Sequence, residues 1–158
     1  MIEDPPLLTV RRTFPRPSAA DVAAFAGIPT GNIVDAMGGR AALDAAIKPI
    51  TGGPFCGPAL TCFTGPDDNL AAFGTLPLAQ PGDVIICAAE GFRRSAITGD
   101  LLAGMMKNRG VVAFVTDGYV RDAAGIRAVG LSCYAAGVSP NSPAKNGPGT
   151  VGLPIVVG

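Results

Sequence analysis

The chain has 158 residues, of which 48% are hydrophobic and 15% charged, and its formal net charge is zero. A chain of this length and composition has enough apolar residues to fold as one domain and is not disordered. Without a basic run or a net positive charge, it is not expected to bind nucleic acid through phosphates. Its apolar runs are short and interrupted by Gly or Pro, so no membrane span is expected.

The sequence contains no histidine. This excludes Ser-His-Asp and Cys-His catalysis as well as zinc sites that use imidazole ligands. An acid or base must therefore be Asp, Glu, Lys, Tyr, Cys or water. A metal site built from this chain must be rich in oxygen ligands, which favours Mg²⁺, Mn²⁺ or Ca²⁺.

Four cysteines, at positions 56, 62, 87 and 133, form no CxxC pair. Cys62 and Cys87 lie in apolar, strand-like runs, so we interpret them as reduced core residues. The acidic, proline-bearing start of the chain does not resemble a signal peptide. A cytoplasmic protein is therefore expected.

The first 17 residues, which contain four prolines and three arginines, predict an extended arm that is mobile or lies on a neighbour. A single α/β domain is expected over residues 18–158. Ser18 and Asp21 resemble a capping box and predict a helix that ends at Gly27.

A second helix is predicted over residues 31–38, with Thr30 as its cap. Asp35 lies within it, either as a solvated helix carboxylate or as a functional residue. Residues 40–50 are interpreted as a short helix that turns into a strand at Ile50. Alternation predicts the next strand over residues 59–63.

Residues 67–69, with the sequence Asp-Asp-Asn, are interpreted as a helix entry whose carboxylates favour the helix dipole. A buried strand is predicted over residues 84–89. Glu90, Arg93 and Arg94 follow that strand at its carboxyl end and could reach a ligand crevice there.

The stretch from residue 99 to residue 122 predicts a helix, a turn at Gly110, a buried strand and a polar loop that opens another helix. Thr98 is the expected cap of the first of these helices. Strands are also expected over residues 131–137 and 151–158. Strands that alternate with helices favour an α/β sheet with a parallel portion.

The two ends of this stretch carry the candidate chemistry. Gly99, Asp100, Leu101 and Leu102 lie at a helix start, where free amides and the positive end of the dipole suit an anion.

Asp117, Arg121 and Asp122 follow the buried strand, where ligands collect in α/β folds. Structural interpretations remain open: Asp122 caps the next helix, Arg121 pairs with Asp122 or Asp117, and Asp100 is only a first-turn acid. A Schiff-base lysine is not expected, because no lysine lies at an apolar strand end.

The motifs GDLLA and GVVAFVTDGYVRD, followed by a strand and AAGVSP, resemble the regulator-of-ribonuclease-activity-A-like family. That family includes the class II 4-hydroxy-4-methyl-2-oxoglutarate/4-carboxy-4-hydroxy-2-oxoadipate aldolases. The resemblance covers roughly residues 29–158. It implies a swivelling β/β/α domain with a mixed, partly parallel sheet flanked by helices. It also implies a homotrimer or hexamer whose active sites lie between subunits.

In the aldolase branch, the resemblance implies that Arg121 and the amides of Gly99, Asp100, Leu101 and Leu102 hold the carboxylate of a 2-oxo acid. Asp122 would anchor Mg²⁺ or Mn²⁺, largely through water. Asp100 would position a metal-linked water for proton transfer. Asn69 and Arg93 are candidates for contact with the distal end of the substrate.

The implied activity is metal-dependent cleavage of a 4-hydroxy-2-oxo acid to pyruvate and a second oxo compound. Decarboxylation of oxaloacetate is expected as a side reaction, because it passes through the same enolate. The alternative is a non-catalytic protein that inhibits an endoribonuclease by protein–protein binding, as the family's namesake does.

The sequence also departs from the family. Family members continue past the position of Gly158 with further strands, and the aldolases take a glutamate from a neighbouring subunit in that region. The chain is therefore expected to lack these C-terminal strands, and this places catalysis in question more than the fold.

Overall fold

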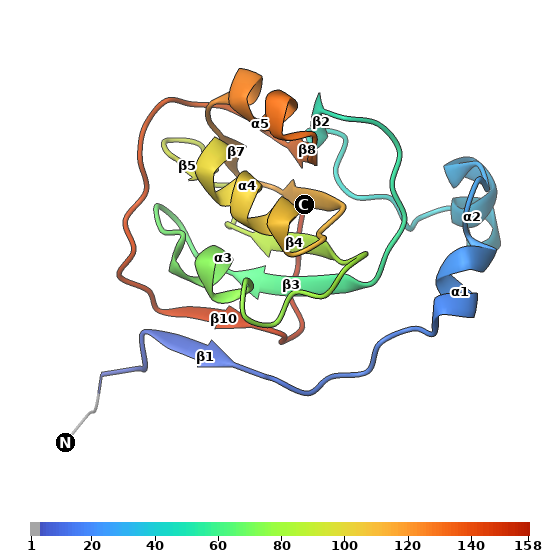
Figure 1. Ribbon diagram of the computed structural model, residues 1–158, viewed down its shortest axis with the longest axis horizontal. Helices are drawn as coiled ribbons and strands as arrows, with labels where there is room; N and C mark the ends of the chain where they lie inside the picture. Colours follow the sequence, from blue (N-terminus) through green and yellow to red (C-terminus); the bar gives the residue numbers. More distant parts are fainter. Residues whose placement is uncertain (1–3) are drawn as a thin grey trace.

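A mixed seven-stranded sheet forms the centre of the computed structural model, which describes residues 4–158 (Figure 1). The strand order is β1-β10-β3-β4-β6-β8-β2. The four central strands are parallel, β10 and β2 pair antiparallel on either side of them, and β1 lies parallel to β10. The strands are β1 (Leu8–Val10), β2 (Lys48–Thr51), β3 (Ala59–Phe63), β4 (Val84–Ala88), β6 (Ala113–Thr116), β8 (Ser132–Ala135) and β10 (Gly149–Val151).

A second, smaller sheet contains three parallel strands within the described part of the chain, in the order β5-β7-β9. These strands are β5 (Ala96–Thr98), β7 (Tyr119–Val120) and β9 (Gly137–Val138). Strands β5 and β7 come directly before the two helix starts that the sequence marks as candidate sites. The small sheet therefore fixes the distance between those two helix starts.

Helices α3 (Leu70–Gly74), α4 (Asp100–Asn108) and α5 (Ala123–Val129) pack on one face of the large sheet (Figure 1). Successive side chains of β4 point to opposite faces of the sheet. Ile85 and Cys87 are buried in the core on the helix side, whereas Val84 belongs to a smaller cluster with Ala113 and Val115. The α/β architecture with a mixed, partly parallel sheet confirms the predicted fold class.

Helices α1 (Ala19–Ala24) and α2 (Thr30–Ala36) stand at one edge of the molecule and contain no buried residue (Figure 1). Phe25, Ile28 and Met37, which flank these helices, remain exposed. The arm before them is attached to the body, because β1 pairs with β10 and the Arg16 guanidinium binds the buried Asp83 carboxylate through both oxygens. No helix of residues 4–158 is long and apolar enough to cross a membrane.

Several local predictions are confirmed. The Ser18 capping box forms with both of its hydrogen bonds, the third strand has the predicted bounds, and Gly130 ends α5 in the left-handed conformation.

Other local predictions are wrong. Residues 40–44 form no helix, and the last strand covers Gly149–Val151 instead of residues 151–158. Thr30 is the first residue of α2, which Pro29 precedes as N-cap. Thr98 is taken up by β5, so Gly99 is the N-cap of α4.

Candidate functional site

A pocket of about 250 Å³ lies at the N-terminus of α4. Gly99, Asp100, Leu101 and Leu102 line it, together with Arg121 from the loop after β7. The structure therefore brings together the residues that the sequence marks for the carboxylate end of the substrate, together with Asn69, whereas Arg93 lies in a different pocket. No side chain caps α4, so the first amides of this nine-residue helix keep their capacity to bind an anion.

Gly99 lets Arg121 and Asp122 come close to the α4 backbone. A Cβ atom at position 99 would lie 2.5 Å from Oδ2 of Asp122 and 3.1 Å from Nε of Arg121. The backbone of Gly99 is extended, with φ −132° and ψ −166°, a conformation that other residues also adopt. The need for glycine here is therefore one of space and not of backbone conformation.

Arg121 is held from both sides. Its Nε lies 3.2 Å from Oδ2 of Asp122, and its Nη1 donates a hydrogen bond of 2.5 Å to Oγ of Ser142. The Arg121 amide donates to the carbonyl of Thr98 at 2.9 Å, which joins β7 to the end of β5. These contacts fix the guanidinium in the pocket wall, where it can form bidentate hydrogen bonds with a carboxylate.

Asp122 is the N-cap of α5 but makes no capping hydrogen bond through its side chain. Its φ of 54° is in the left-handed region, which is uncommon for a residue other than glycine. Asp122 thus occupies the predicted N-cap position without a side-chain capping bond, and the pairing of Arg121 with Asp122 is confirmed. The Asp122 carboxylate remains 44% exposed beside the pocket.

Asp100 begins α4 and packs against α5. A Cβ atom at Gly125 would lie 2.6 Å from both Cβ and Oδ2 of Asp100. Gly125 thus leaves room for the Asp100 carboxylate between the two helices, at the wall of the pocket.

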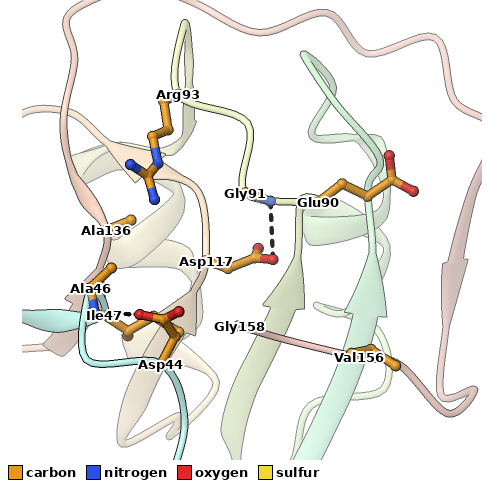
Figure 2. Close-up of a pocket in the computed structure, with 10 residues that line it drawn as sticks. All are labelled: Asp44, Ala46, Ile47, Glu90, Gly91, Arg93, Asp117, Ala136, Val156 and Gly158. Atoms are coloured by element: carbon orange, nitrogen blue, oxygen red, sulfur yellow. Dashed lines mark hydrogen bonds between the residues drawn. The ribbon is translucent and has the colours of Figure 1, made fainter.

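The crevice expected at the strand ends is divided in two. Asp117, Glu90 and Arg93 line a separate pocket of about 380 Å³ beyond β4 and β6 (Figure 2). The Asp117 carboxylate there accepts hydrogen bonds from the amides of Ala89 (2.7 Å) and Gly91 (3.1 Å). Asp117 ties the two strand ends together, so its inclusion in one crevice with Arg121 is wrong.

The segment Asp67, Asp68 and Asn69 has a second structural role that the sequence does not indicate. It does open α3, as predicted, but it also binds the loop of residues 142–147. We call this loop the strap. Asn69 and Lys145 face the pocket together with Phe73, and of these three the sequence indicates only Asn69 for ligand contact. The contact between distant segments leaves no signal in the local pattern of the sequence.

The donor set near the pocket suits a hard divalent cation that keeps most of its water. Within residues 4–158, no group of three or more Asp, Glu, Cys or His side chains is arranged to hold a metal ion. Mg²⁺ and Mn²⁺ can nevertheless bind through one or two carboxylates plus water and the substrate's own oxygens. Asp122 supplies a half-exposed carboxylate for this mode of binding.

The cysteines agree with the interpretation of reduced core residues: all four are free thiols, and Cys62, Cys87 and Cys133 are buried. Cys62 and Cys87 are direct neighbours on β3 and β4. A hydrogen bond with Cys87, together with burial, raises the pKa of Cys62 well above its ordinary value. Burial raises the pKa of Cys133 to about 12. These thiols take no part in the pocket at α4.

Comparison with known proteins agrees with the α/β fold. A family model described as RraA-like (Aldolase/RraA) matches residues 30–158. The chain belongs to this family.

A curated relative from Halalkalibacterium halodurans, named "Putative 4-hydroxy-4-methyl-2-oxoglutarate aldolase", is 37% identical over 135 residues. The match covers 85% of this chain but 64% of that relative, so the chain spans less than two thirds of its length.

Two solved structures share the fold. The RNA-processing inhibitor RraA from Thermus thermophilis has a TM-score of 0.73 and 28% identity, with 81% of this chain and 78% of that chain covered. RraAS2 from Streptomyces coelicolor, described as an unusual member of the RNase ES inhibitor RraA protein family, has a TM-score of 0.71 and 26% identity. Its match covers 86% of this chain and 72% of the other. The family thus contains relatives named as aldolases and relatives named as inhibitors.

Proposed function

We propose that the protein is a divalent-metal-dependent class II aldolase, a lyase that cleaves a 4-hydroxy-2-oxo acid to pyruvate and a second oxo compound. The observation that carries this proposal is the joint placement of Arg121 and the uncapped start of α4 around one pocket, with the Asp122 carboxylate paired to Arg121 beside it. The name of the Halalkalibacterium halodurans relative supports the same reaction.

The carboxylate of the 2-oxo acid would bind between Arg121 and the first amides of α4. Both groups supply hydrogen-bond donors with positive charge or partial charge, which suits an anion. Because Ser142 and Asp122 already hold the guanidinium, little side-chain freedom would be lost when the carboxylate binds. The substrate would therefore be oriented with its 2-oxo group toward Asp122.

In the retro-aldol step, the C3–C4 bond breaks and its electron pair moves into the 2-oxo group, which gives the enolate of pyruvate. The 4-hydroxyl loses its proton to a base and becomes the carbonyl of the second product. The enolate then takes a proton at C3 to give pyruvate. Asp100 would position a water for this proton transfer, and its place in the pocket wall beside the α4 amides supports this role.

Mg²⁺ or Mn²⁺ held by Asp122 would supply Lewis-acid stabilisation of the negative charge on the enolate oxygen. The same stabilisation applies to oxaloacetate, whose loss of CO₂ leaves the same enolate. Oxaloacetate decarboxylation is therefore part of the proposal as a side activity.

We also propose that the working protein is a homo-oligomer, either a trimer or a hexamer. The exposed apolar side chains of Phe25, Ile28 and Met37 around α1 and α2 support an interface there, because no described segment of this chain covers them.

Inhibition of an endoribonuclease by protein–protein binding is the second candidate function. The printed descriptions of the Thermus and Streptomyces relatives favour it. Binding of a ribonuclease by Arg121→Ala as well as by the parent, with no pyruvate released by either, would support this candidate over the aldolase.

The decisive test couples pyruvate release to lactate dehydrogenase, with 4-hydroxy-4-methyl-2-oxoglutarate and oxaloacetate as substrates. The parent is expected to release pyruvate with Mg²⁺ and to stop when EDTA is added. Arg121→Ala and Asp122→Ala are expected to lose at least about 100-fold in rate. Arg127→Ala, which changes an exposed arginine on α5 outside the pocket, is the matched control. Release that is equal with Mg²⁺ and with EDTA would contradict the proposal.

A further inference from the structure

Asp68 lies outside the pocket at the start of α4 but binds the strap, which forms one wall of that pocket. Asp68 is 5% exposed and belongs to no salt bridge within residues 4–158. Its carboxylate instead accepts hydrogen bonds from the amides of Leu70 (2.8 Å), Asn146 (2.5 Å) and Gly147 (3.0 Å). Two of these three donors belong to the strap. A buried carboxylate therefore depends on the strap for most of its hydrogen bonds.

The backbone attaches the same two segments a second time. The amide of Ala144 donates to the carbonyl of Asp67 at 2.7 Å, and the amide of Asn69 donates to the carbonyl of Ala144 at 3.0 Å. These two bonds form a parallel bridge in which Ala144 is the partner of Asp68. Residues 144–147 of the strap are therefore attached to the entry of α3 by backbone and side chain together.

Pro143 connects this attached part of the strap to Ser142. Its ring fixes its own φ, and it restricts the residue before it to extended conformations. The link between Ala144 and Ser142 is therefore stiff, and a displacement of Ala144 is expected to move Ser142. On the other side of Ser142, the carbonyl of Asn141 accepts from the amide of Ala96 at 3.0 Å. Ser142 is thus held between two attached residues.

Ser142 links the strap to the arginine that the proposed chemistry uses. Its Oγ accepts from Nη1 of Arg121 at 2.5 Å, and the Asp122 carboxylate lies 3.2 Å from Nε. Nη2 of Arg121 has no hydrogen-bond partner in the described part of the chain and remains free for an anion. Because the guanidinium is planar, contacts at Nε and Nη1 together fix the direction in which Nη2 points. With Ser142 removed, Asp122 alone would hold the guanidinium, through a single nitrogen.

We infer that Asp68 is a positioning residue for Arg121, on which it acts through the strap and Ser142. The nature of the anion that Arg121 binds is taken from the proposed function, on which this inference rests. An attached strap holds the guanidinium in place, so less side-chain freedom is lost when the anion binds. Because coupling between two sites is reciprocal, a bound anion stabilises the attachment of the strap to Asp68 to the same extent.

The experiment is a double-mutant cycle with oxalate as the probe, measured by calorimetry in the presence of Mg²⁺. Oxalate is a small dianion that no aldol reaction can cleave, so the readout does not depend on turnover. Asp68→Ser keeps a hydroxyl that can accept from the Leu70 amide two residues on, but this side chain is too short to reach the strap. Ser142→Ala removes the acceptor of Nη1.

Ser142→Ala is expected to weaken oxalate binding about fivefold, and Ser142→Thr, which keeps the hydroxyl, is expected to restore it. Asp68→Ser is expected to weaken binding about threefold, since Asn141 still holds one side of Ser142. If Asp68 acts through Ser142, the double variant loses about fivefold, the same as Ser142→Ala alone. Losses that multiply to about fifteenfold would overturn the inference, as would full affinity in Asp68→Ser.

Asp117→Ser is the matched control. Asp117 is also a buried aspartate that accepts from two backbone amides, but these belong to Ala89 and Gly91, which lie outside the strap. The oxalate affinity of this variant is expected to equal that of the parent, whereas its melting temperature falls as in Asp68→Ser. An equal loss of affinity in the two variants would report general damage to the fold and would overturn the inference.

A second measurement needs no substitution at Asp68. Oxalate is expected to slow hydrogen exchange of the Asn146 and Gly147 amides at least about twofold in the parent, but not in Ser142→Ala. Both amides bind Asp68, and neither residue lines the pocket, so slower exchange reports attachment of the strap and not contact with the ligand. Unchanged exchange in the parent, or equal slowing in Ser142→Ala, would overturn the inference.

The outcome is separable from that of the pyruvate assay. A cycle in which Asp68 acts only through Ser142, together with no pyruvate release, would support the inference and contradict the aldolase proposal. Pyruvate release with independent effects of the two substitutions would do the reverse. Failure of the parent to bind oxalate would overturn the inference whatever the pyruvate assay shows.

Discussion

Gly99 and Asp122 approach each other so closely that a Cβ atom at position 99 would lie 2.5 Å from the Asp122 carboxylate oxygen Oδ2. The same Cβ atom would lie 3.0 Å from Cγ of Arg121. The start of α4 therefore lies directly against the side chains of Arg121, which lines the pocket, and Asp122, which precedes α5. Their relative position depends on the absence of one methyl group.

Gly99→Ala is predicted to damage the site without unfolding the protein. The extended backbone at position 99 accepts alanine, so the added methyl group must displace the side chains of Asp122 and Arg121. A displacement of about 1 Å of such groups reduces activity by about 100-fold. The measurements are pyruvate release and the melting temperature, which is expected to change by only a few degrees.

Gly104→Ala is the matched control for this variant, because a Cβ atom there would lie 3.9 Å from the nearest atom, Cγ2 of Val129. Alanine is also favoured over glycine within a helix by about 1 kcal/mol. Equal activity losses in the two variants would show that the space at Gly99 has no special role.

Arg16→Met is predicted to lower the stability of the fold by about 3 kcal/mol. Asp83 is 1% exposed, and besides Arg16 its carboxylate accepts from the amide of Gln80 at 2.9 Å. Loss of the guanidinium leaves a buried carboxylate without its cation, which is strongly destabilising. Urea unfolding measures the effect, with the exposed Arg12→Met as control. A change below about 0.5 kcal/mol in Arg16→Met would contradict the importance of this contact.

The buried thiols are predicted to make the protein less stable at alkaline pH. The pKa of Cys133 is raised to about 12 in the folded state, and burial is the cause. The unfolded chain releases this proton at about pH 8.5, so the folded state binds more protons above that pH. The contribution of Cys133 to stability is therefore complete below about pH 8.5 and is lost as the pH rises toward 12.

The free energy of unfolding from urea titrations is expected to fall between pH 8 and pH 10 by about 1–2 kcal/mol for this thiol. Cys133→Ala is expected to show a smaller fall than the parent over the same interval. Identical pH dependence of the two proteins would mean that Cys133 ionises equally in the folded and the unfolded states.

The large sheet was predictable because the sequences of its central strands show clear local patterns of hydrophobicity. Residues 59–63 alternate and residues 84–88 form an apolar run, and both patterns report burial directly. The three-stranded sheet was not predicted, since β5, β7 and β9 contain only two or three residues each. Segments of that length show no period, and tertiary contacts alone decide their conformation.

Some residues of the candidate site were likewise predictable from local sequence patterns, and others were not. Gly99, Asp100 and Arg121 were found because helix starts and strand ends are visible in the sequence. Lys145 was not, because hydrogen bonds between Asp68 and the strap bring it to the pocket. Asp117 was misplaced because a carboxylate after a strand looks the same whether it faces a ligand or, as here, binds two amides of a neighbouring strand end.

In the proposed reaction, Arg121, Asp122 and the start of α4 bind the enolate of pyruvate with the help of a divalent cation. Oxalate is a planar dianion that resembles this enolate, and its binding can be measured by calorimetry without turnover. The parent is predicted to bind oxalate at least tenfold more tightly with Mg²⁺ than with EDTA. Arg121→Lys and Asp122→Asn are predicted to lose this gain, because lysine cannot grip a carboxylate through two parallel hydrogen bonds and asparagine lacks the charge. Oxalate affinity that is unaffected by Mg²⁺, or that is unchanged in both variants, would contradict enolate binding at this site.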